Sequence, residues 1–222
     1  MTLHVNAIIV FAKYPEPGKV KTRLGAQIGN EAAARLYRLF LTQTFELCQA
    51  RDEAWLSYVA FEPQEREEWF REVVPGSFRL VAQTGESLGA RLQAAFHNVF
   101  ADGAQRVIAI GSDSPTLPRE YLLQAFERLH KFDLVLGPAE DGGYYLVGLA
   151  QPRPELFEGI LWSSSSVLEQ TLKRAQDQAL SYHLLPLWYD VDDRATLQRA
   201  AREDASGRIT TCLQEHSQET PS

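Results

Sequence analysis

Four cationic side chains follow the first apolar run of the chain within eleven positions. The run covers residues 8–11 and has the continuous apolar character of a strand buried on both faces of a parallel sheet. Prolines and a glycine set a turn around the cations, which are Lys13, Lys19, Lys21 and Arg23. Ligands of open α/β sheets bind beyond the carboxyl ends of the strands, so this loop is expected to bind donor phosphates. An ordinary solvated basic loop is the alternative.

The loop matches neither of the two familiar nucleotide-binding fingerprints. A P-loop has a spacing of glycines before its Lys-Ser/Thr pair that neither Lys21-Thr22 nor Gly18-Lys19 satisfies. No G-x-G-x-x-G follows the first predicted strand, so the sequence does not support dinucleotide binding of the Rossmann type.

Asp113 lies three residues beyond a buried strand expected at residues 106–110, in a turn rich in serine and proline. This position places its carboxylate at the carboxyl edge of the sheet, where the cationic loop also lies. Mg²⁺ binds through one or two carboxylates together with substrate phosphates, so Asp113 can anchor a metal ion and serve catalysis. The structural alternative is an aspartate that caps the next helix or closes an Asx-turn.

A second acidic cluster, formed by Asp190, Asp192 and Asp193, follows a late predicted strand. One of these carboxylates could converge with Asp113 and complete a metal site. Asp193 is equally well suited to cap the helix predicted from residue 194, where a carboxylate accepts main-chain N–H groups. The residues alone leave open which of the three faces the metal.

A diglycine turn with acidic and aromatic neighbours separates two further predicted strands. Carboxylates accept hydroxyl protons and an exposed tyrosine ring can stack on a sugar, so this run is expected to bind the acceptor. The run consists of Glu140, Asp141, Gly142, Gly143, Tyr144 and Tyr145. Asp141 is the candidate general base, although reach to the proton is a matter of geometry. Asp-Gly also favours plain hairpin turns, which is the structural alternative.

Predicted strands and helices alternate along most of the chain. Strands are expected at residues 8–11, 54–61, 78–81, 106–110, 133–137, 144–149 and 182–187, and helices at 30–50, 63–73, 88–100, 117–130, 163–175 and 194–203. This alternation predicts an α/β fold with three layers, α/β/α, around a mostly parallel central sheet. Residues 1–213 are expected to form a single domain, followed by a polar C-terminal tail at 214–222.

The composition limits the partners and the compartment. The net charge of -7 argues against nucleic-acid binding, which needs a basic face. No apolar run approaches the roughly 20 residues that a membrane-spanning helix needs, so no membrane span is expected. The start of the chain does not resemble a secretory leader, and Cys48 and Cys212 lie far apart. We therefore expect a cytoplasmic protein with reduced cysteines.

Three motifs occur in an order that resembles the nucleotide-diphospho-sugar transferase-like superfamily, which has the GT-A fold. They are P-x-P-G-x-V-K-T-R-L after the first strand, G-S-D-S-P around Asp113, and G-P-A-E-D-G-G-Y-Y. Within the superfamily the sequence is similar to the bacterial DUF2064 type, described as glycosyltransferases, from about residue 7 to residue 197. The resemblance implies that Asp113 is the aspartate of the metal-binding signature and that Asp192, in D-V-D, is a second metal ligand. The S-D-S pattern departs from a literal D-x-D, and Asp193-Arg194-Ala195 departs from the usual continuation after D-V-D.

The resemblance also implies the ligands. In the similar proteins the segment after the third strand lies near the nucleobase, which assigns Gly85, Glu86, Leu88 and Gly89 to that region. The implied cofactor is Mg²⁺ or Mn²⁺, and the implied partners are a nucleotide-activated donor and a small-molecule acceptor.

Two reactions and one inactive alternative fit these motifs. Glycosyl transfer from a nucleotide-diphospho-sugar is favoured, and nucleotidyl transfer from an NTP to a small phosphorylated acceptor is the alternative. A catalytically silent nucleotide-binding domain would not need both Asp113 and Asp192. The sequence does not indicate the acceptor, the base of the donor or the oligomeric state.

Overall fold

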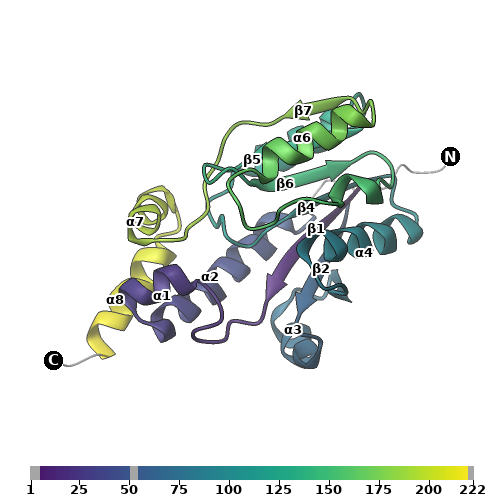
Figure 1. Ribbon diagram of the computed structural model, residues 1–222. Helices are drawn as coiled ribbons and strands as arrows, with labels where there is room; N and C mark the ends of the chain where they lie inside the picture. Colours follow the sequence, from purple (N-terminus) through teal and green to yellow (C-terminus); the bar gives the residue numbers. More distant parts are fainter. Residues whose placement is uncertain (1–5, 51–54, 220–222) are drawn as a thin grey trace.

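The computed structural model describes residues 6–50 and 55–219, with side chains described up to residue 215. A central sheet contains the strands in the order β3-β2-β1-β4-β6-β5-β7 (Figure 1). Their bounds are β1 Asn6–Lys13, β2 Trp55–Glu62, β3 Phe78–Ala82, β4 Arg106–Ile110, β5 Leu134–Pro138, β6 Tyr144–Leu149 and β7 Tyr182–Leu184. Only β6 runs antiparallel to its neighbours β4 and β5, so the predicted mostly parallel sheet is confirmed.

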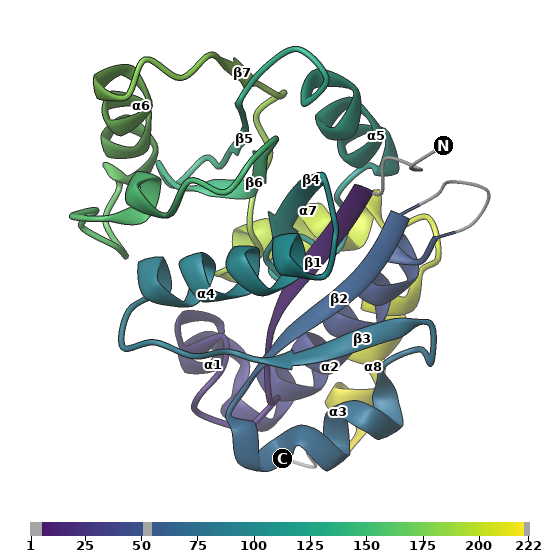
Figure 2. The ribbon, with the colours of Figure 1, turned by 90° about the vertical axis from the view of Figure 1, so that its right-hand side faces the viewer.

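Helices cover both faces of the sheet. Their bounds are α1 Thr22–Ile28, α2 Asn30–Cys48, α3 Glu67–Val73, α4 Leu88–Ala101, α5 Arg119–Arg128, α6 Val167–Asp177, α7 Arg194–Glu203 and α8 Arg208–Glu219, with 3₁₀ turns η1 Gln64–Arg66 and η2 Pro154–Phe157. Successive side chains of a strand point to opposite faces. On β1, Ile8 and Val10 join the core under α2 and α5, whereas Ile9 joins the core under α4 and η2. Figure 2 shows α4 in front of the sheet and α2 behind it, which confirms the three layers.

The helical connections on the two sides of β1 lie on opposite faces of the sheet, and a crevice forms between β1 and β4 where they diverge. β1 pairs with β2 on one side and with β4 on the other, in parallel register on both. The connection from β1 to β2 contains α2 on one face, and the connection from β3 to β4 contains α4 on the other. A ligand site in an open α/β sheet lies at such a switch point, outside the carboxyl ends of the strands. Lys13, the last residue of β1, and Asp113, just beyond β4, both lie there.

Several elements differ from the sequence expectations. The short helix α1 starts directly after the cationic turn and was not among the predicted helices. The predicted helix 163–175 begins only at Val167, because Ser163 has a φ of 63° that no right-handed helix accepts. The predicted strand 182–187 ends at Leu184. The predicted strand 54–61 is β2, although residue 54 lies outside the described residues.

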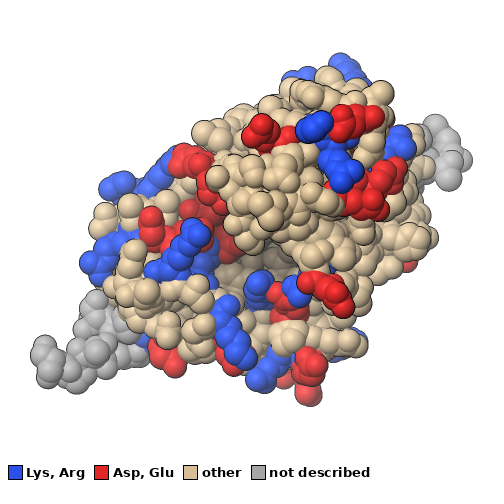
Figure 3. All heavy atoms as spheres, in the orientation of Figure 1, with Lys and Arg blue, Asp and Glu red and all other residues tan. Residues whose placement is uncertain are grey.

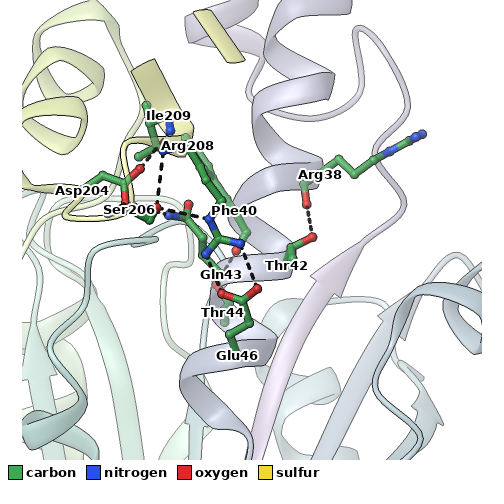
Figure 4. A network of polar contacts seen from close by, with 10 residues as sticks. All are labelled: Arg38, Phe40, Thr42, Gln43, Thr44, Glu46, Asp204, Ser206, Arg208 and Ile209. Atoms are coloured by element: carbon green, nitrogen blue, oxygen red, sulfur yellow. Dashed lines mark hydrogen bonds and ion pairs between the residues drawn. The ribbon is translucent and has the colours of Figure 1, made fainter. Parts of the chain in front are cut away.

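The chain is helical where the sequence predicts a polar tail. Helix α8 spans Arg208–Glu219, and residues 220–222 of the predicted tail lie outside the described residues. Figure 4 shows how α8 is attached to α2: the Arg208 guanidinium binds the Glu46 carboxylate at 2.8 and 2.5 Å. The Asp204 carboxylate accepts from the main-chain N–H groups of Ser206 and Ile209 at 3.1 and 2.9 Å, which fixes the start of the helix.

Two composition-based expectations can be compared with the structure. Among the described residues no helix is long and apolar enough to cross a membrane. Cys48 is buried, Cys212 is half-buried, and both are free.

Candidate active site

The carboxyl ends of the central strands surround a cavity of about 560 Å³. The predicted phosphate-binding side chains Lys13, Lys19, Lys21 and Arg23 all line it. Asp113, Asp190 and Asp192 line the same cavity and form its acidic wall. Figure 3 shows a hollow on this face with cationic and acidic side chains around its rim. The fold therefore brings the first loop and both acidic segments to one place, from positions almost 180 residues apart in the chain.

Lys21 is the buried cation of this group. Its backbone is left-handed, with φ 47° and ψ 45°, and it ends the turn from which α1 starts. Its side chain is only 3% exposed, and its Nζ lies 2.6 Å from Asp113 Oδ1 and 3.2 Å from Asp192 Oδ1. Burial alone would lower the pKa of Lys21, but the neighbouring Asp113 and Asp192 carboxylates raise it above its ordinary value. The ammonium group is therefore a fixed positive charge between two acidic segments.

The other cations of the first loop are exposed and only weakly fixed. Lys13 pairs with Glu62 at 3.2 Å, and Lys19 pairs with Glu16 at 2.9 Å. Arg23 makes no ion pair or hydrogen bond with any residue that the structure describes. Exposed ion pairs contribute about 0–1 kcal/mol, so a phosphate can compete for these side chains at little cost.

The turn that carries Asp113 is held from two sides. The main-chain oxygen of Asp113 accepts from Val191 N at 2.9 Å, which joins the two acidic segments. The preceding Ser112 hydroxyl lies 2.8 Å from the hydroxyl of Tyr37 on α2, which also accepts from Lys13 N at 3.0 Å. Burial, followed by the charge of Asp113, raises the pKa of Tyr37, so this hydroxyl stays neutral. Tyr37 thus connects the ends of β1 and β4.

Asp113 does not cap the following helix. Helix α5 starts after Pro118, which has no side-chain cap, so the capping alternative is wrong. The carboxylate of Asp113 is 47% exposed and faces Lys21 in the cavity. This orientation leaves it available to a ligand.

The three aspartates of the late cluster have three different environments. Asp193 caps α7: its carboxylate accepts from Thr196 N at 2.8 Å in a reciprocal capping box, which lowers its pKa. Asp192 faces Lys21 and is 42% exposed. Asp190 accepts from the Ser114 hydroxyl at 2.6 Å, and burial together with the charge of Asp113 raises its pKa to about 6. Asp192 is therefore the member of the cluster whose carboxylate shares the Lys21 partner with Asp113. Its role as a metal ligand stays a prediction.

A polar cluster at the ends of β2 and β3 was not among the predicted site residues. The Glu62 carboxylate binds Lys13 Nζ and the guanidinium of Arg91, and all three line the cavity. Gln83 also lines it, and its Nε2 donates to the main-chain oxygens of Ala60 and Ala12 at 2.8 and 3.3 Å. Glu62 aligns with Lys13 in the register of β2 against β1, a relation that only the strand pairing reveals.

The predicted nucleobase segment touches the cavity at one residue. Leu88 lines the cavity and is 45% exposed, whereas Glu86 is exposed outside it. Gly85 has a φ of 124°, and its main-chain oxygen accepts from Arg91 Nε at 3.1 Å. Gly89 is a packing residue, because an added Cβ would lie 2.7 Å from Phe157 O and Trp162 Nε1. The turn thus orients Arg91 and lets α4 approach η2 closely.

The acidic residues of the predicted acceptor run lie at the edge of the site. Glu140 binds Arg199 of α7 at 2.9 Å and does not line the cavity. Asp141 is exposed, and its Oδ1 accepts from Gly143 N at 2.9 Å. Asp141 also lies outside the cavity lining, yet its charge contributes to the raised pKa of Asp190. The structure therefore brings Asp141 near the acidic wall without placing it in contact with the cavity.

The glycines and tyrosines of the run are mainly structural. Gly142 has a φ of 90°, and its oxygen accepts from Leu168 N at 3.0 Å, which joins the turn to α6. Tyr145 also lines the cavity, but it is 4% exposed, lies against Gly137 and donates to Pro186 O at 3.0 Å, so little of its ring is open to a sugar. Tyr144 is half-buried and lines the cavity, but its hydroxyl is buried, which raises its pKa. Of the two tyrosines, Tyr144 is the more exposed and the better placed to contact a ligand.

Comparisons with known proteins agree with this architecture. Residues 44–164, more than half of the chain, match the family described as "Uncharacterized protein conserved in bacteria (DUF2064)". The chain belongs to this family. No curated protein matches it.

Solved structures confirm the fold of this DUF2064 protein. It is 32% identical to a "putative nucleotide-diphospho-sugar transferase" from Desulfovibrio desulfuricans G20, with a TM-score of 0.83 over 95% of this chain and 97% of that one. It is 13% identical to CMP:2-keto-3-deoxy-manno-octonic acid synthetase complexed with CTP, with a TM-score of 0.55 over 91% and 99% of the chains. It is also 13% identical to the inositol-1-phosphate CTP transferase from T. maritima, with a TM-score of 0.50 over 97% and 98%. The last two likenesses concern the fold alone.

The acidic wall of the DUF2064 protein fits a divalent cation. Asp113 Oδ1 and Asp192 Oδ1 come from different segments, yet both lie within hydrogen-bonding distance of one point, the Nζ of Lys21. Mg²⁺ and Mn²⁺ prefer carboxylate oxygens, and Mg²⁺ uses one or two of them together with substrate phosphates. Within residues 6–50 and 55–219 no group of three or more His, Cys, Asp or Glu could hold a metal. Phosphate oxygens and water would therefore have to complete the coordination.

Proposed function

We propose that this protein is a metal-dependent glycosyltransferase that uses a nucleotide-diphospho-sugar and a small-molecule acceptor. One observation carries the proposal: the cations of the first loop and the carboxylates of Asp113 and Asp192 line a single cavity at the switch point of the sheet. The relative from Desulfovibrio desulfuricans G20, described as a "putative nucleotide-diphospho-sugar transferase", supports it at 32% identity.

The cavity has the charge distribution that a metal–diphosphate needs. Lys13, Lys19, Lys21 and Arg23 would contact the phosphates, and each full contact is worth about 4 kcal/mol of gross Coulomb energy at intermediate dielectric, before desolvation. Asp113 and Asp192 would hold Mg²⁺ or Mn²⁺ beside the same phosphates. The bound ion would stabilise the negative charge that develops on the leaving diphosphate.

The proposed reaction exchanges one bond at the anomeric carbon of the donor. The bond from this carbon to the diphosphate oxygen breaks, and a bond from the carbon to the acceptor oxygen forms. The acceptor hydroxyl proton passes to a base, for which Asp141 is our candidate, and the nucleoside diphosphate leaves with the electron pair. Asp141 is exposed next to the acidic wall, so an acceptor bound at the mouth of the cavity could bring its hydroxyl within reach.

Nucleotidyl transfer from an NTP is the second candidate, and the number of cations favours it. Arg91 adds a fifth cationic side chain to the four of the first loop, and five cations suit a triphosphate. In this reaction the α-phosphorus is attacked by a phosphorylated acceptor and pyrophosphate leaves. The CTP-dependent proteins of the same fold are compatible with this chemistry, but they are only 13% identical to this chain.

A screen of ligands by thermal shift tests the proposal. NTPs and nucleotide sugars are added with Mg²⁺ or Mn²⁺, and the best ligands are then incubated with candidate acceptors. We expect a metal-dependent rise in melting temperature with a nucleotide sugar, followed by release of nucleoside diphosphate. Release of pyrophosphate from an NTP would assign nucleotidyl transfer instead. Nucleotide binding that is independent of metal, without turnover, would favour a catalytically silent binding domain. A cytoplasmic location remains part of the proposal and is supported by the free cysteines.

A further inference from the structure

Lys21 differs from the other cations of the cavity because it is buried between two carboxylates. Its side chain is 3% exposed, whereas Lys13 and Lys19 are 60% and 72% exposed. Its Nζ lies 2.6 Å from Asp113 Oδ1 and 3.2 Å from Asp192 Oδ1. These oxygens are the ones assigned above to the metal ion. An ammonium group therefore lies where a metal ion would have to bind.

The main chain that carries the two carboxylates is held by contacts that do not involve Lys21. The main-chain oxygen of Asp113 accepts from Val191 N at 2.9 Å, and Asp192 N donates to the Thr196 hydroxyl at 3.1 Å. Thr196 belongs to the capping box that starts α7, so the segment is fixed to a helix. The main chain of the acidic pair is thus held in place without a ligand, and Lys21 balances one of its two negative charges.

We propose that Lys21 keeps the metal site closed until a nucleotide phosphate draws its ammonium group away, so that the metal ion binds with the nucleotide and not before it. This inference rests on the proposed function, because it takes Asp113 and Asp192 as metal carboxylates and the cavity as the phosphate site. An ammonium group and a divalent cation compete for the same oxygens, and their like charges repel at close distance.

The ion pairs lost and gained by Lys21 determine when the metal site opens. Without a nucleotide, a Lys21 side chain that moves away gives up both of its partners and leaves two half-exposed carboxylates facing each other, which is unfavourable. With a nucleotide, the phosphate becomes the new partner of the ammonium group and the metal becomes the new partner of the carboxylates. Each charge of the site therefore has a partner both before and after the nucleotide and the metal bind. We expect Lys21 to leave the carboxylates only when both ligands bind together.

Binding of Mn²⁺ alone tests this proposal without any turnover. We would titrate the wild type and Lys21→Met with Mn²⁺ in the absence of nucleotide and follow free Mn²⁺ by electron paramagnetic resonance. Lys21→Met has a similar length but no charge, so we expect it to bind Mn²⁺ at least tenfold more tightly than the wild type. Lys173→Met is the matched control: it removes the same charge from a pair with Asp177 at 3.4 Å on exposed α6, and Mn²⁺ affinity should not change.

A second variant and a second readout protect the test against misfolding. Lys21→Gln is also neutral but keeps a hydrogen-bond donor toward Asp113, and it should show the same gain in Mn²⁺ affinity. Mn²⁺ should raise the melting temperature of both variants by several degrees more than that of the wild type, because a ligand stabilises the state that it binds.

The outcomes separate this proposal from the proposed function. If the Lys21 variants bind Mn²⁺ with the same affinity as the wild type, Lys21 does not close the metal site, even if the wild type binds metal–nucleotide well. A wild type that binds no nucleotide with Mn²⁺ refutes the proposed function instead. A tenfold gain in Mn²⁺ affinity for Lys21→Met, with no gain for Lys173→Met, supports the proposal that Lys21 closes the metal site.

Discussion

Replacing Asp113 by asparagine separates a metal-binding role from a structural one. The variant keeps the shape of the side chain and the main-chain oxygen that accepts from Val191 N. It loses the negative charge that faces Lys21, but this carboxylate is 47% exposed and Asp192 stays within 3.2 Å of the ammonium group. Because solvent screens the lost ion pair, the free energy of unfolding should fall by only about 1 kcal/mol.

The effect of Asp113→Asn on turnover should be much larger. A divalent ion stabilises the charge of a leaving diphosphate by several kcal/mol, and each 1.36 kcal/mol corresponds to a tenfold change in rate. Loss of the main anchor of the ion is therefore expected to lower turnover by roughly 10²–10⁴. Metal-dependent nucleotide binding should weaken in parallel, whereas the melting temperature should fall by only a few degrees.

The assay combines urea unfolding, calorimetric titration with nucleotide and Mn²⁺, and turnover with the donor found in the screen. Asp193→Asn is the matched control, because it changes a carboxylate of the acidic cluster that caps α7 and does not line the cavity. Because asparagine caps a helix about as well as aspartate, this variant should cost less than about 1 kcal/mol of stability and leave metal–nucleotide binding unchanged. An Asp113→Asn protein that melts earlier but binds metal–nucleotide normally would falsify the metal role.

Three further predictions concern other parts of the structure. Arg23→Met should weaken nucleotide binding by about tenfold or more without lowering the melting temperature, since a hydrogen bond to a charged group contributes about 1.5–3 kcal/mol; unchanged affinity at low salt would reject its phosphate role. Asp141→Asn should lower turnover with a true acceptor more than it lowers donor affinity. The reverse result would assign Asp141 to the donor side of the site and the first loop to the acceptor side. Asp204→Ala should cost about 1–3 kcal/mol in urea unfolding, because its carboxylate accepts from Gln43, Ser206 and Ile209; a loss no larger than that of Asp177→Ala on the surface of α6 would contradict this.

The apolar runs predicted the strands well, because a strand that is covered on both faces needs apolar side chains along its whole length. The run at residues 8–11 and the exact bounds of β4 follow from strands that are covered on both faces. Helix α1 was harder to predict, since it has seven residues, includes a glycine and starts within the cationic segment. Helix α8 is polar, and its attachment depends on Arg208, Glu46 and Ile209, which meet only in the folded protein. Local composition carries no signal for such long-range contacts.

The candidate site was predictable in its location more than in the orientation of its side chains. A carboxylate after a buried strand had to lie at the carboxyl edge, which placed Asp113 correctly. The sequence could not decide between Tyr144 and Tyr145, because adjacent residues of a strand face opposite sides and the register selects which one is buried. It also could not show that Glu140 binds Arg199, or that Glu62 joins Lys13 and Arg91 across strands.

The wide separation of Lys21, Asp113 and Asp192 along the chain has a consequence for protein synthesis. A nascent chain on the ribosome exposes the cationic loop early, when the partners of Lys21 have not yet been translated. The pair of carboxylates is complete only after Asp192 has emerged, 171 positions after Lys21. Under the proposed function, an unfinished chain can therefore attract nucleotides by charge but lacks one of the two carboxylates of the metal site. Metal-dependent chemistry would then have to wait until the segment that carries Asp192 has left the ribosome.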